Sequence, residues 1–274
     1  MPRPVLIGLP YDASSSFLRG AADAPPAIRA ALQSSAGNGW SERTGLVIGP
    51  DGLEDAGDLI LGDSPASRLA IEQHVRLVAA SGRPPILLGG DHSVTYPILR
   101  AIGPLHPSLT VLHVDAHADL YDEFEGDRYS HACPFARVME EGLVHHLVQL
   151  GIRTLTGDQA AQVRRFGVEL IDMRAWADGA RPSIAGPVYV SIDLDGLDPA
   201  FAPGVSHREP GGLSVREVLS VLAAINGPIV GADLVEYNPS QDVAGLTAHV
   251  AAKFVKELAG LMLRGPAAHI AGLP

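Results

Sequence analysis

Short apolar runs alternate with longer segments of helical periodicity along most of this chain. The apolar runs predict strands over Val5–Leu9, Pro85–Leu88, Leu109–Val114, His146–Gly151, Val168–Ile171, Val188–Ile192 and Ile229–Val235. Apolar positions at helical spacing predict helices over Pro25–Leu32, Arg68–Ala80, Val94–Ile102, Ala132–Glu141, Asp158–Phe166, Val215–Ile225 and Leu246–Leu263. This alternation predicts an α/β fold with three layers, in which helices cover both faces of a mostly parallel central sheet.

No linker, internal repeat or low-complexity tract divides the 274 residues. We therefore expect one domain over 1–274, which is large but acceptable for a single α/β unit. The segment Gln33–Ser41 is expected to be a surface loop. Asp198–Gly212 is too long for an ordinary connection, and long ordered loops beside a site tend to carry function.

Carboxylates and imidazoles directly follow three of the predicted strands. These residues are His92, Asp115, His117, Asp119, Asp193 and Asp195. Strand side chains two positions apart point the same way, and α/β sheets place their sites at the carboxyl ends of strands. Taken singly, an Asp-x-Asp here is typical of a helix cap or turn, and a histidine of a loop. Together, four carboxylates would repel one another unless cations neutralised them, so the set predicts a pair of Mn²⁺-like ions.

Composition and charge restrict the remaining function classes. The formal net charge is −11 without a basic cluster, which argues against nucleic-acid binding and mildly favours cationic substrates. No apolar run approaches the roughly 20 residues of a membrane span. The N-terminus enters strand-like sequence at once, so we expect no signal peptide. Cys133 is the single cysteine, which excludes an internal disulfide and predicts a cytoplasmic location.

Three sequence blocks together resemble the metal motifs of the ureohydrolases, the family of arginase, agmatinase, guanidinobutyrase and formiminoglutamase. They are Gly-Gly-Asp-His-Ser at 89–93, Asp-Ala-His-Ala-Asp-Leu at 115–120 and Ser-Ile-Asp-Leu-Asp-Gly-Leu-Asp-Pro at 191–199. The resemblance runs from Ile7 to about Ala259. It is nearest to plant-type arginases and agmatinase-like members, with support from 14–20, 129–137 and 201–207. It implies the arginase-type three-layer fold and a homo-trimer or homo-hexamer.

The resemblance also implies how two Mn²⁺ ions per chain would be divided among the six residues. One ion would be held by His92, Asp115, Asp119 and Asp193. The other would be held by Asp115, His117, Asp193 and Asp195, so that Asp115 and Asp193 bridge the pair. Two such ions share a water and lower its pKa to near neutrality, which creates a nucleophile.

Further roles follow from the same resemblance, each beside an ordinary alternative. Glu236 would pair with a guanidinium cation, although alone it reads as a loop residue. Asp119 would relay a proton to the leaving amine, and His131 would exchange protons with solvent or simply begin a helix. His207 would contact the substrate or pack within its loop.

Four other polar residues are expected to have structural rather than catalytic roles. Asp91 is expected to be a supporting or turn residue, and Asp242 to cap the last helix or support the site. His145 and His146 are expected at the surface.

The implied activity is hydrolysis of a terminal guanidino group to urea and an amine. The likeness to plant-type arginases favours L-arginine, which would give ornithine. Tyr121 stands where animal-type arginases carry an Asn, which favours agmatine, with guanidinobutyrate or another guanidino compound as further alternatives. A deacetylase-like amidohydrolase with one Zn²⁺ and a non-catalytic family member remain as remote alternatives.

Overall fold

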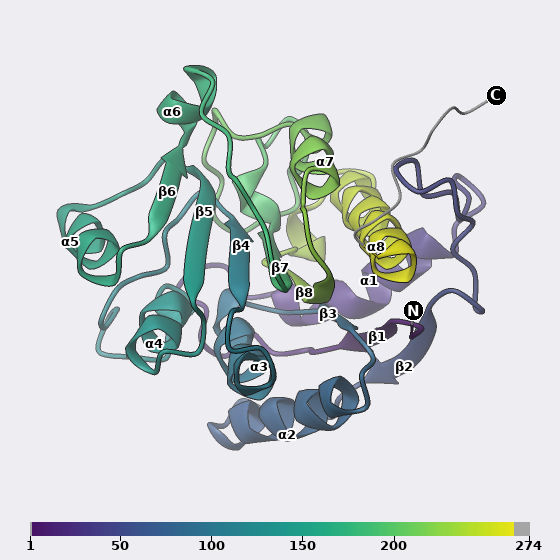
Figure 1. The fold of residues 1–274 in the computed structure, drawn as a ribbon, viewed down its shortest axis with the longest axis horizontal. Coiled ribbons are helices and arrows are strands. Elements are labelled where there is room, and N and C mark those ends of the chain that lie inside the picture. Colours follow the sequence, from purple (N-terminus) through teal and green to yellow (C-terminus); the bar gives the residue numbers. More distant parts are fainter. Residues whose placement is uncertain (1, 266–274) are drawn as a thin grey trace.

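Eight parallel strands form one central sheet in the computed structural model, which describes residues 2–265 (Figure 1). The strands are β1 (Val5–Gly8), β2 (Glu54–Asp58), β3 (Pro85–Leu88), β4 (Thr110–Val114), β5 (His146–Ile152), β6 (Glu169–Asp172), β7 (Val188–Asp193) and β8 (Ile229–Val235). Their order in the sheet is β2-β1-β3-β8-β7-β4-β5-β6. The predicted α/β class with a parallel sheet is confirmed. Residues 1 and 266–274 of the predicted domain lie outside the described residues.

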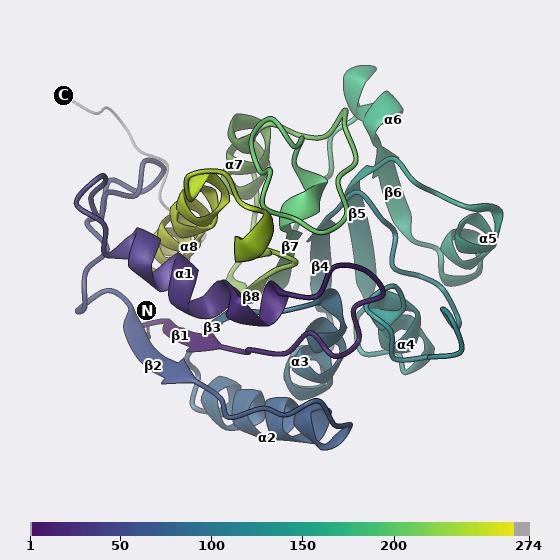
Figure 2. The ribbon, with the colours of Figure 1, turned by 180° about the vertical axis from the view of Figure 1, so that it is seen from behind.

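Helices pack on both faces of the sheet (Figures 1 and 2). One face is covered by α2 (Ala66–Ala80), α3 (Thr95–Ile102), α4 (Pro134–Glu140) and α5 (Gly157–Phe166). The other is covered by α1 (Ala24–Leu32), α6 (Met173–Ala177), α7 (Val215–Ala223) and α8 (Leu246–Arg264). Successive strand residues enter opposite apolar clusters, because side chains alternate across a strand: Ile86 packs with α8 and Leu87 with α3. The strands are therefore buried on both faces, as in other parallel sheets.

Two elements, β2 and α6, were not predicted, because neither shows a clear apolar pattern in the sequence. Strand β2 carries Glu54, Asp55 and Asp58 and lies at the edge of the sheet, where it pairs with β1. Arg3 pairs with Glu54, and Arg29 pairs with Asp55 and Asp58, so ion pairs rather than buried apolar side chains hold this strand. Helix α6 has only five residues, too few to show a period.

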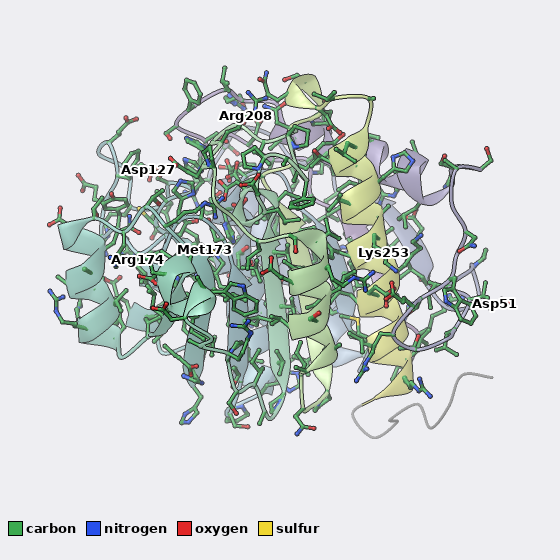
Figure 3. The ribbon with its side chains drawn as sticks, turned by 90° about the horizontal axis from the view of Figure 1, so that it is seen from above. Asp51, Asp127, Met173, Arg174, Arg208 and Lys253 are labelled. Atoms are coloured by element: carbon green, nitrogen blue, oxygen red, sulfur yellow. The ribbon has the colours of Figure 1, made fainter. Side chains whose placement is uncertain are left out.

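The four strands β3, β8, β7 and β4 are neighbours in the middle of the sheet. Because all are parallel, their carboxyl ends lie at the same edge. Figure 3 shows the strands side-on, with the long loop that carries Arg208 at one end of the sheet. This loop, 198–212, contains no helix or strand, as predicted. No helix within residues 2–265 combines the length and apolarity needed to span a membrane.

Candidate metal centre

The carboxyl ends of the four central strands deliver most of the predicted site. His92 follows β3, Asp115 follows β4, Asp193 ends β7 and Glu236 follows β8. All four side chains are buried, with exposed fractions of at most 3%. At this edge the backbone of Gly90 lies close to that of Tyr11. A Cβ on Gly90 would lie 1.8 Å from the Tyr11 carbonyl oxygen, so that position requires glycine.

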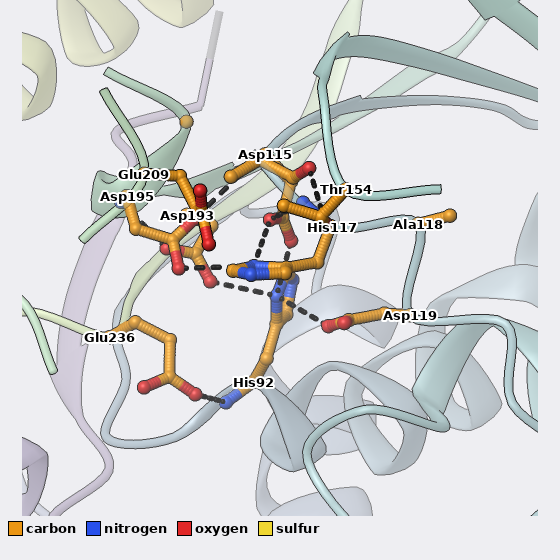
Figure 4. Close-up of polar contacts among 12 residues, drawn as sticks. His92, Asp115, His117, Ala118, Asp119, Thr154, Asp193, Asp195, Glu209 and Glu236 are labelled. Carbon is orange, nitrogen blue, oxygen red and sulfur yellow. Dashed lines mark hydrogen bonds and ion pairs between the residues drawn. The ribbon is translucent and has the colours of Figure 1, made fainter. Parts of the chain in front are cut away.

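Three carboxylate oxygens surround one nitrogen of His92. Its Nδ1 lies 3.2 Å from an oxygen of Asp115 and 3.1 Å from oxygens of Asp119 and Asp193 (Figure 4). Burial lowers the pKa of His92, but these carboxylates outweigh it and raise that pKa well above its usual value. Atoms that share a cation at about 2.2 Å and a right angle are separated by about 3.1 Å. The three separations from His92 Nδ1 therefore match those between two ligands of one such ion.

The other nitrogen of His92 is held by a buried polar relay. Its Nε2 lies 3.0 Å from Ser191 Oγ, and that hydroxyl donates to Asp233 at 2.6 Å. Since the serine hydrogen is used on Asp233, the imidazole Nε2 must donate its own hydrogen to Ser191. In the neutral imidazole, the form that binds a metal, the lone pair of Nδ1 then faces the three carboxylates, and Nδ1 has no hydrogen-bond partner. A buried lone pair opposite carboxylates fits a metal cation, and such supporting partners commonly orient metal-binding histidines.

A second group of donors surrounds His117. Its Nδ1 lies 3.3 Å from one oxygen of Asp115 and 3.2 Å from one oxygen of Asp195. The two oxygens of Asp115 therefore face different imidazoles, Oδ2 toward His92 and Oδ1 toward His117. Asp193 contacts His92, whereas no ion pair joins it to His117 in the described part of the chain. The structure thus brings together the predicted second set except for that one contact.

His113 supports Asp115 and was missed by the sequence reasoning. Its Nε2 lies 2.7 Å from Asp115 Oδ2. The Gln149 amide donates to His113 Nδ1 at 3.0 Å and to the Ala118 carbonyl at 2.6 Å, so Nδ1 is an acceptor and the Nε2–H of His113 points to Asp115. A histidine inside an apolar strand run, two positions before Asp115, is the signal that could have revealed it.

Glu236 and His131 form a buried pair beside these donors. Glu236 Oε1 accepts from the His92 backbone N–H and from His131 Nδ1, each at 2.9 Å. The second oxygen, Oε2, has no hydrogen bond within residues 2–265. His131 Nε2 lies 2.9 Å from Ser16 Oγ, which fixes the ring from its other side. Burial lowers the pKa of His131, but the Glu236 charge outweighs it and raises that pKa to about 9.

Crowded carboxylates make the site unfavourable without cations. Burial and mutual repulsion raise the pKa of Asp193 well above its usual value, and burial also raises that of Asp195. Asp119 and Glu236 adopt positive φ angles of 51° and 61°. Non-glycine residues adopt this conformation at an energetic cost, and such strain is concentrated at functional sites.

A cavity of about 290 Å³ opens onto the donors. Tyr121, which bears on the choice of substrate, and His207, a candidate substrate contact, both line it. The His207 ring lies 5.2 Å from the His131 ring and 5.8 Å from the His117 ring between centroids. Phe17, from the segment that also carries Ser16, lies 5.7 Å from His207. The cavity is therefore enclosed by loops from distant parts of the chain.

The four polar residues that were expected to have structural roles lie as follows. Asp91 accepts from the Ser14 backbone at 2.8 Å and from Ser93, which fits a turn residue. Asp242 accepts from the backbone N–H groups of Thr247 and Ala248 in the first turn of α8, so it caps that helix. His145 is exposed, and His146 is half-buried beside Glu169.

Known proteins resemble the chain along nearly its whole length. "Arginase 1, mitochondrial" of Arabidopsis thaliana is 45% identical over 93% of this chain and 79% of its own. A guanidinopropionase of Pseudomonas aeruginosa is 38% identical over 96% of this chain and 87% of its own. The solved arginase of Medicago truncatula superposes with a TM-score of 0.90 at 43% identity, covering 95% of this chain and 87% of that one.

The prediction of a cytoplasmic location is contradicted by these comparisons. Plant arginases among the relatives are named mitochondrial or chloroplastic. One unpaired cysteine describes the redox environment that a protein tolerates, and it does not distinguish the cytoplasm from a reducing organelle.

The family itself follows from the match over the whole fold. The sequence profile of the Arginase family matches residues 3–260, which include every candidate ligand and all eight strands. With the structural and sequence relatives, this match establishes that the chain belongs to the Arginase family.

Proposed function

We propose that this chain is a dinuclear manganese hydrolase that cleaves L-arginine to ornithine and urea. The observation that carries the proposal is the convergence of carboxylates on His92 Nδ1 and His117 Nδ1, directly beside the buried carboxylate of Glu236. The 45% identity to a plant arginase favours arginine over other guanidino compounds.

The six predicted ligands would hold the metals in the division stated above. Two bound Mn²⁺ ions would supply the charge that lowers the pKa of a shared water to near neutrality. Asp115, with one oxygen toward each imidazole, is suited to bridge them. Oxygen-rich ligation without thiolate favours Mn²⁺ over Zn²⁺.

Glu236 would bind and orient the guanidinium. Its Oε1 is already held by His92 N–H and His131, so the carboxylate cannot rotate freely. Its Oε2 is left to accept a charge-assisted hydrogen bond from a guanidinium N–H. A planar cation held in this way is presented to the attacking water in one orientation, which is a large part of the barrier reduction in such reactions.

Asp119 and His131 would move the protons. Cleavage requires a proton on the departing amine nitrogen, and Asp119, which lines the cavity, would carry it. His131 would exchange protons between the cavity and solvent, with Ser16 holding its Nε2. His207, whose ring lies near that of His131, would contact the substrate.

Agmatine is the second candidate substrate. Within residues 2–265 no lysine or arginine lines the cavity, so the α-carboxylate of arginine would have no lysine or arginine partner there. Agmatine lacks that carboxylate. The intact ligand set argues against a one-Zn²⁺ amidohydrolase and against a non-catalytic protein.

The assembly and the domain extent are also proposals. We propose a homo-trimer or homo-hexamer and one domain over the whole chain, because closed symmetric oligomers are usual for soluble enzymes. Sedimentation as a monomer at micromolar concentration would contradict the proposed trimer or hexamer.

A urea-release assay tests the function. The Mn²⁺-activated protein should release urea from L-arginine faster than from agmatine, guanidinobutyrate and guanidinopropionate, and elemental analysis should find two Mn²⁺ per chain. Absence of urea from the whole panel, or one tightly held Zn²⁺ without activation by Mn²⁺, contradicts the proposal.

A further inference from the structure

Glu209 is an acidic residue of the cavity wall that the proposed chemistry does not use. It lies in the loop 198–212, is half-buried, and lines the same cavity as Glu236 and the candidate ligands. Across the described chain its carboxylate takes part in no hydrogen bond or ion pair, whereas its backbone carbonyl does. A carboxylate that has no protein partner and lines a cavity is available to a cationic ligand.

The backbone of Glu209 is fixed against the metal-binding segment by Arg153. The Arg153 Nε and Nη2 donate to the Glu209 carbonyl oxygen at 2.9 and 2.5 Å. Nη2 also donates to the Asp195 carbonyl at 2.7 Å, and Nη1 to the Gly196 carbonyl at 3.2 Å. All three guanidinium nitrogens therefore bind backbone oxygens, and Arg153 has no nitrogen without a partner. Figure 4 shows the result, with Glu209 placed beside Asp195.

The other carboxylates of the cavity already have partners or proposed tasks. Asp119, Asp193 and Asp195 face the two imidazoles, and Glu236 is bonded to His131. The part of the wall formed by Thr154, Thr156 and Gln159 carries no charged group. The tail of a substrate whose guanidinium is bound at Glu236 therefore meets one unpaired carboxylate and, within residues 2–265, no lysine or arginine side chain.

We propose that Glu209 binds an ammonium group on the tail of the guanidino substrate. This inference rests on the proposed function and adds to it a rule of specificity. Substrates with a second cationic group, as in arginine and agmatine, are favoured through a charge-assisted hydrogen bond. Substrates whose tail ends only in a carboxylate, such as guanidinobutyrate, are disfavoured because like charges approach in a confined cavity.

The test compares two substrates of similar length in Glu209→Gln, which keeps the shape of the side chain and removes its charge. Agmatine ends in an ammonium and 4-guanidinobutyrate in a carboxylate. In the Mn²⁺-loaded variant, KM for agmatine should rise about 10- to 100-fold while kcat changes little, the size expected for one charge-assisted contact. For 4-guanidinobutyrate, kcat/KM should rise. The ratio of kcat/KM for the two substrates should therefore fall at least about tenfold.

Two further variants identify the cause. Glu209→Asp keeps the charge and should retain the preference for agmatine. Glu123→Gln removes one charge from an exposed position outside the cavity and should change neither substrate. Mn²⁺ content and melting temperature are measured for each variant.

An unchanged ratio in Glu209→Gln, through equal losses for both substrates or no loss, overturns the assignment. Loss of Mn²⁺ from this variant does so as well, because it would place Glu209 among the metal-supporting residues. A wild-type protein that releases urea from neither substrate nor from arginine refutes the proposed function itself, and the specificity rule with it.

Discussion

Replacing Glu236 by glutamine should separate guanidinium binding from metal binding. The carboxylate is 3% exposed, and one of its oxygens accepts two hydrogen bonds of 2.9 Å. Glutamine keeps the shape but removes the charge that would face the substrate and His131. Removal of one partner from a buried charged pair costs about 2–5 kcal/mol. At about 1.4 kcal/mol per tenfold change, kcat/KM should fall roughly 30- to 5,000-fold.

The assay measures urea release from L-arginine at saturating Mn²⁺, together with the metal content of the purified variant. Metal content should stay near that of the wild-type protein, because Glu236 contacts His92 only through a backbone N–H. Glu123→Gln, an exposed change of the same charge, serves as the control. Near-normal urea release would show that the guanidinium is bound elsewhere. Loss of Mn²⁺ would place Glu236 among the ligands.

Three further predictions concern the metals and one proton. Asp193→Ala should lose most of both Mn²⁺ ions and nearly all activity, since Asp193 is proposed to bridge them; elemental analysis that finds one ion fully retained contradicts this. Chelation should lower the melting temperature by roughly 5–10 °C, reversibly on adding Mn²⁺, because binding stabilises the native state by mass action; an unchanged melting curve after verified metal removal argues against the assembled cluster. In metal-free protein, the His131 pKa of about 9 means that its pair with Glu236 stabilises the fold fully below pH 6.5. That contribution is lost as the pH rises through about 9. Denaturant titrations should therefore show that the free energy of unfolding falls more steeply with pH in the wild-type protein than in His131→Gln. If the two proteins lose stability in parallel, the pair makes no such contribution.

Buried strands and their terminal carboxylates could be predicted because burial on both faces leaves a continuous apolar run. The predicted bounds of β3 and β8, Pro85–Leu88 and Ile229–Val235, agree with the structure. Strand β2 could not be predicted, since its pairing with β1 and the ion pair of Arg29 with Asp55 arise only in the folded chain. Charged edge strands carry no apolar signal of their own.

The candidate ligands could be predicted for the same reason, but Ser191 and Asp233, which support His92, could not. Both lie inside apolar runs, where a single polar residue is indistinguishable from a solvated one. Only the tertiary structure shows that β7 lies between β4 and β8 and brings Ser191 between His92 and Asp233. The unpaired state of Glu209 is likewise a property of the packed loop.

The order of the central strands has a consequence for how the chain matures. Strands β3 and β4 are consecutive in sequence, yet β8 and β7 lie between them. His92 and Asp115 therefore cannot complete their sites with the residues made first, and a nascent chain must wait until residue 236 is available. Such long-range insertion is intrinsically slow. Because the ligands converge only after that insertion, we expect Mn²⁺ to bind last and to mark the molecules that have reached the full topology, so that metal uptake during refolding reports completion of the sheet.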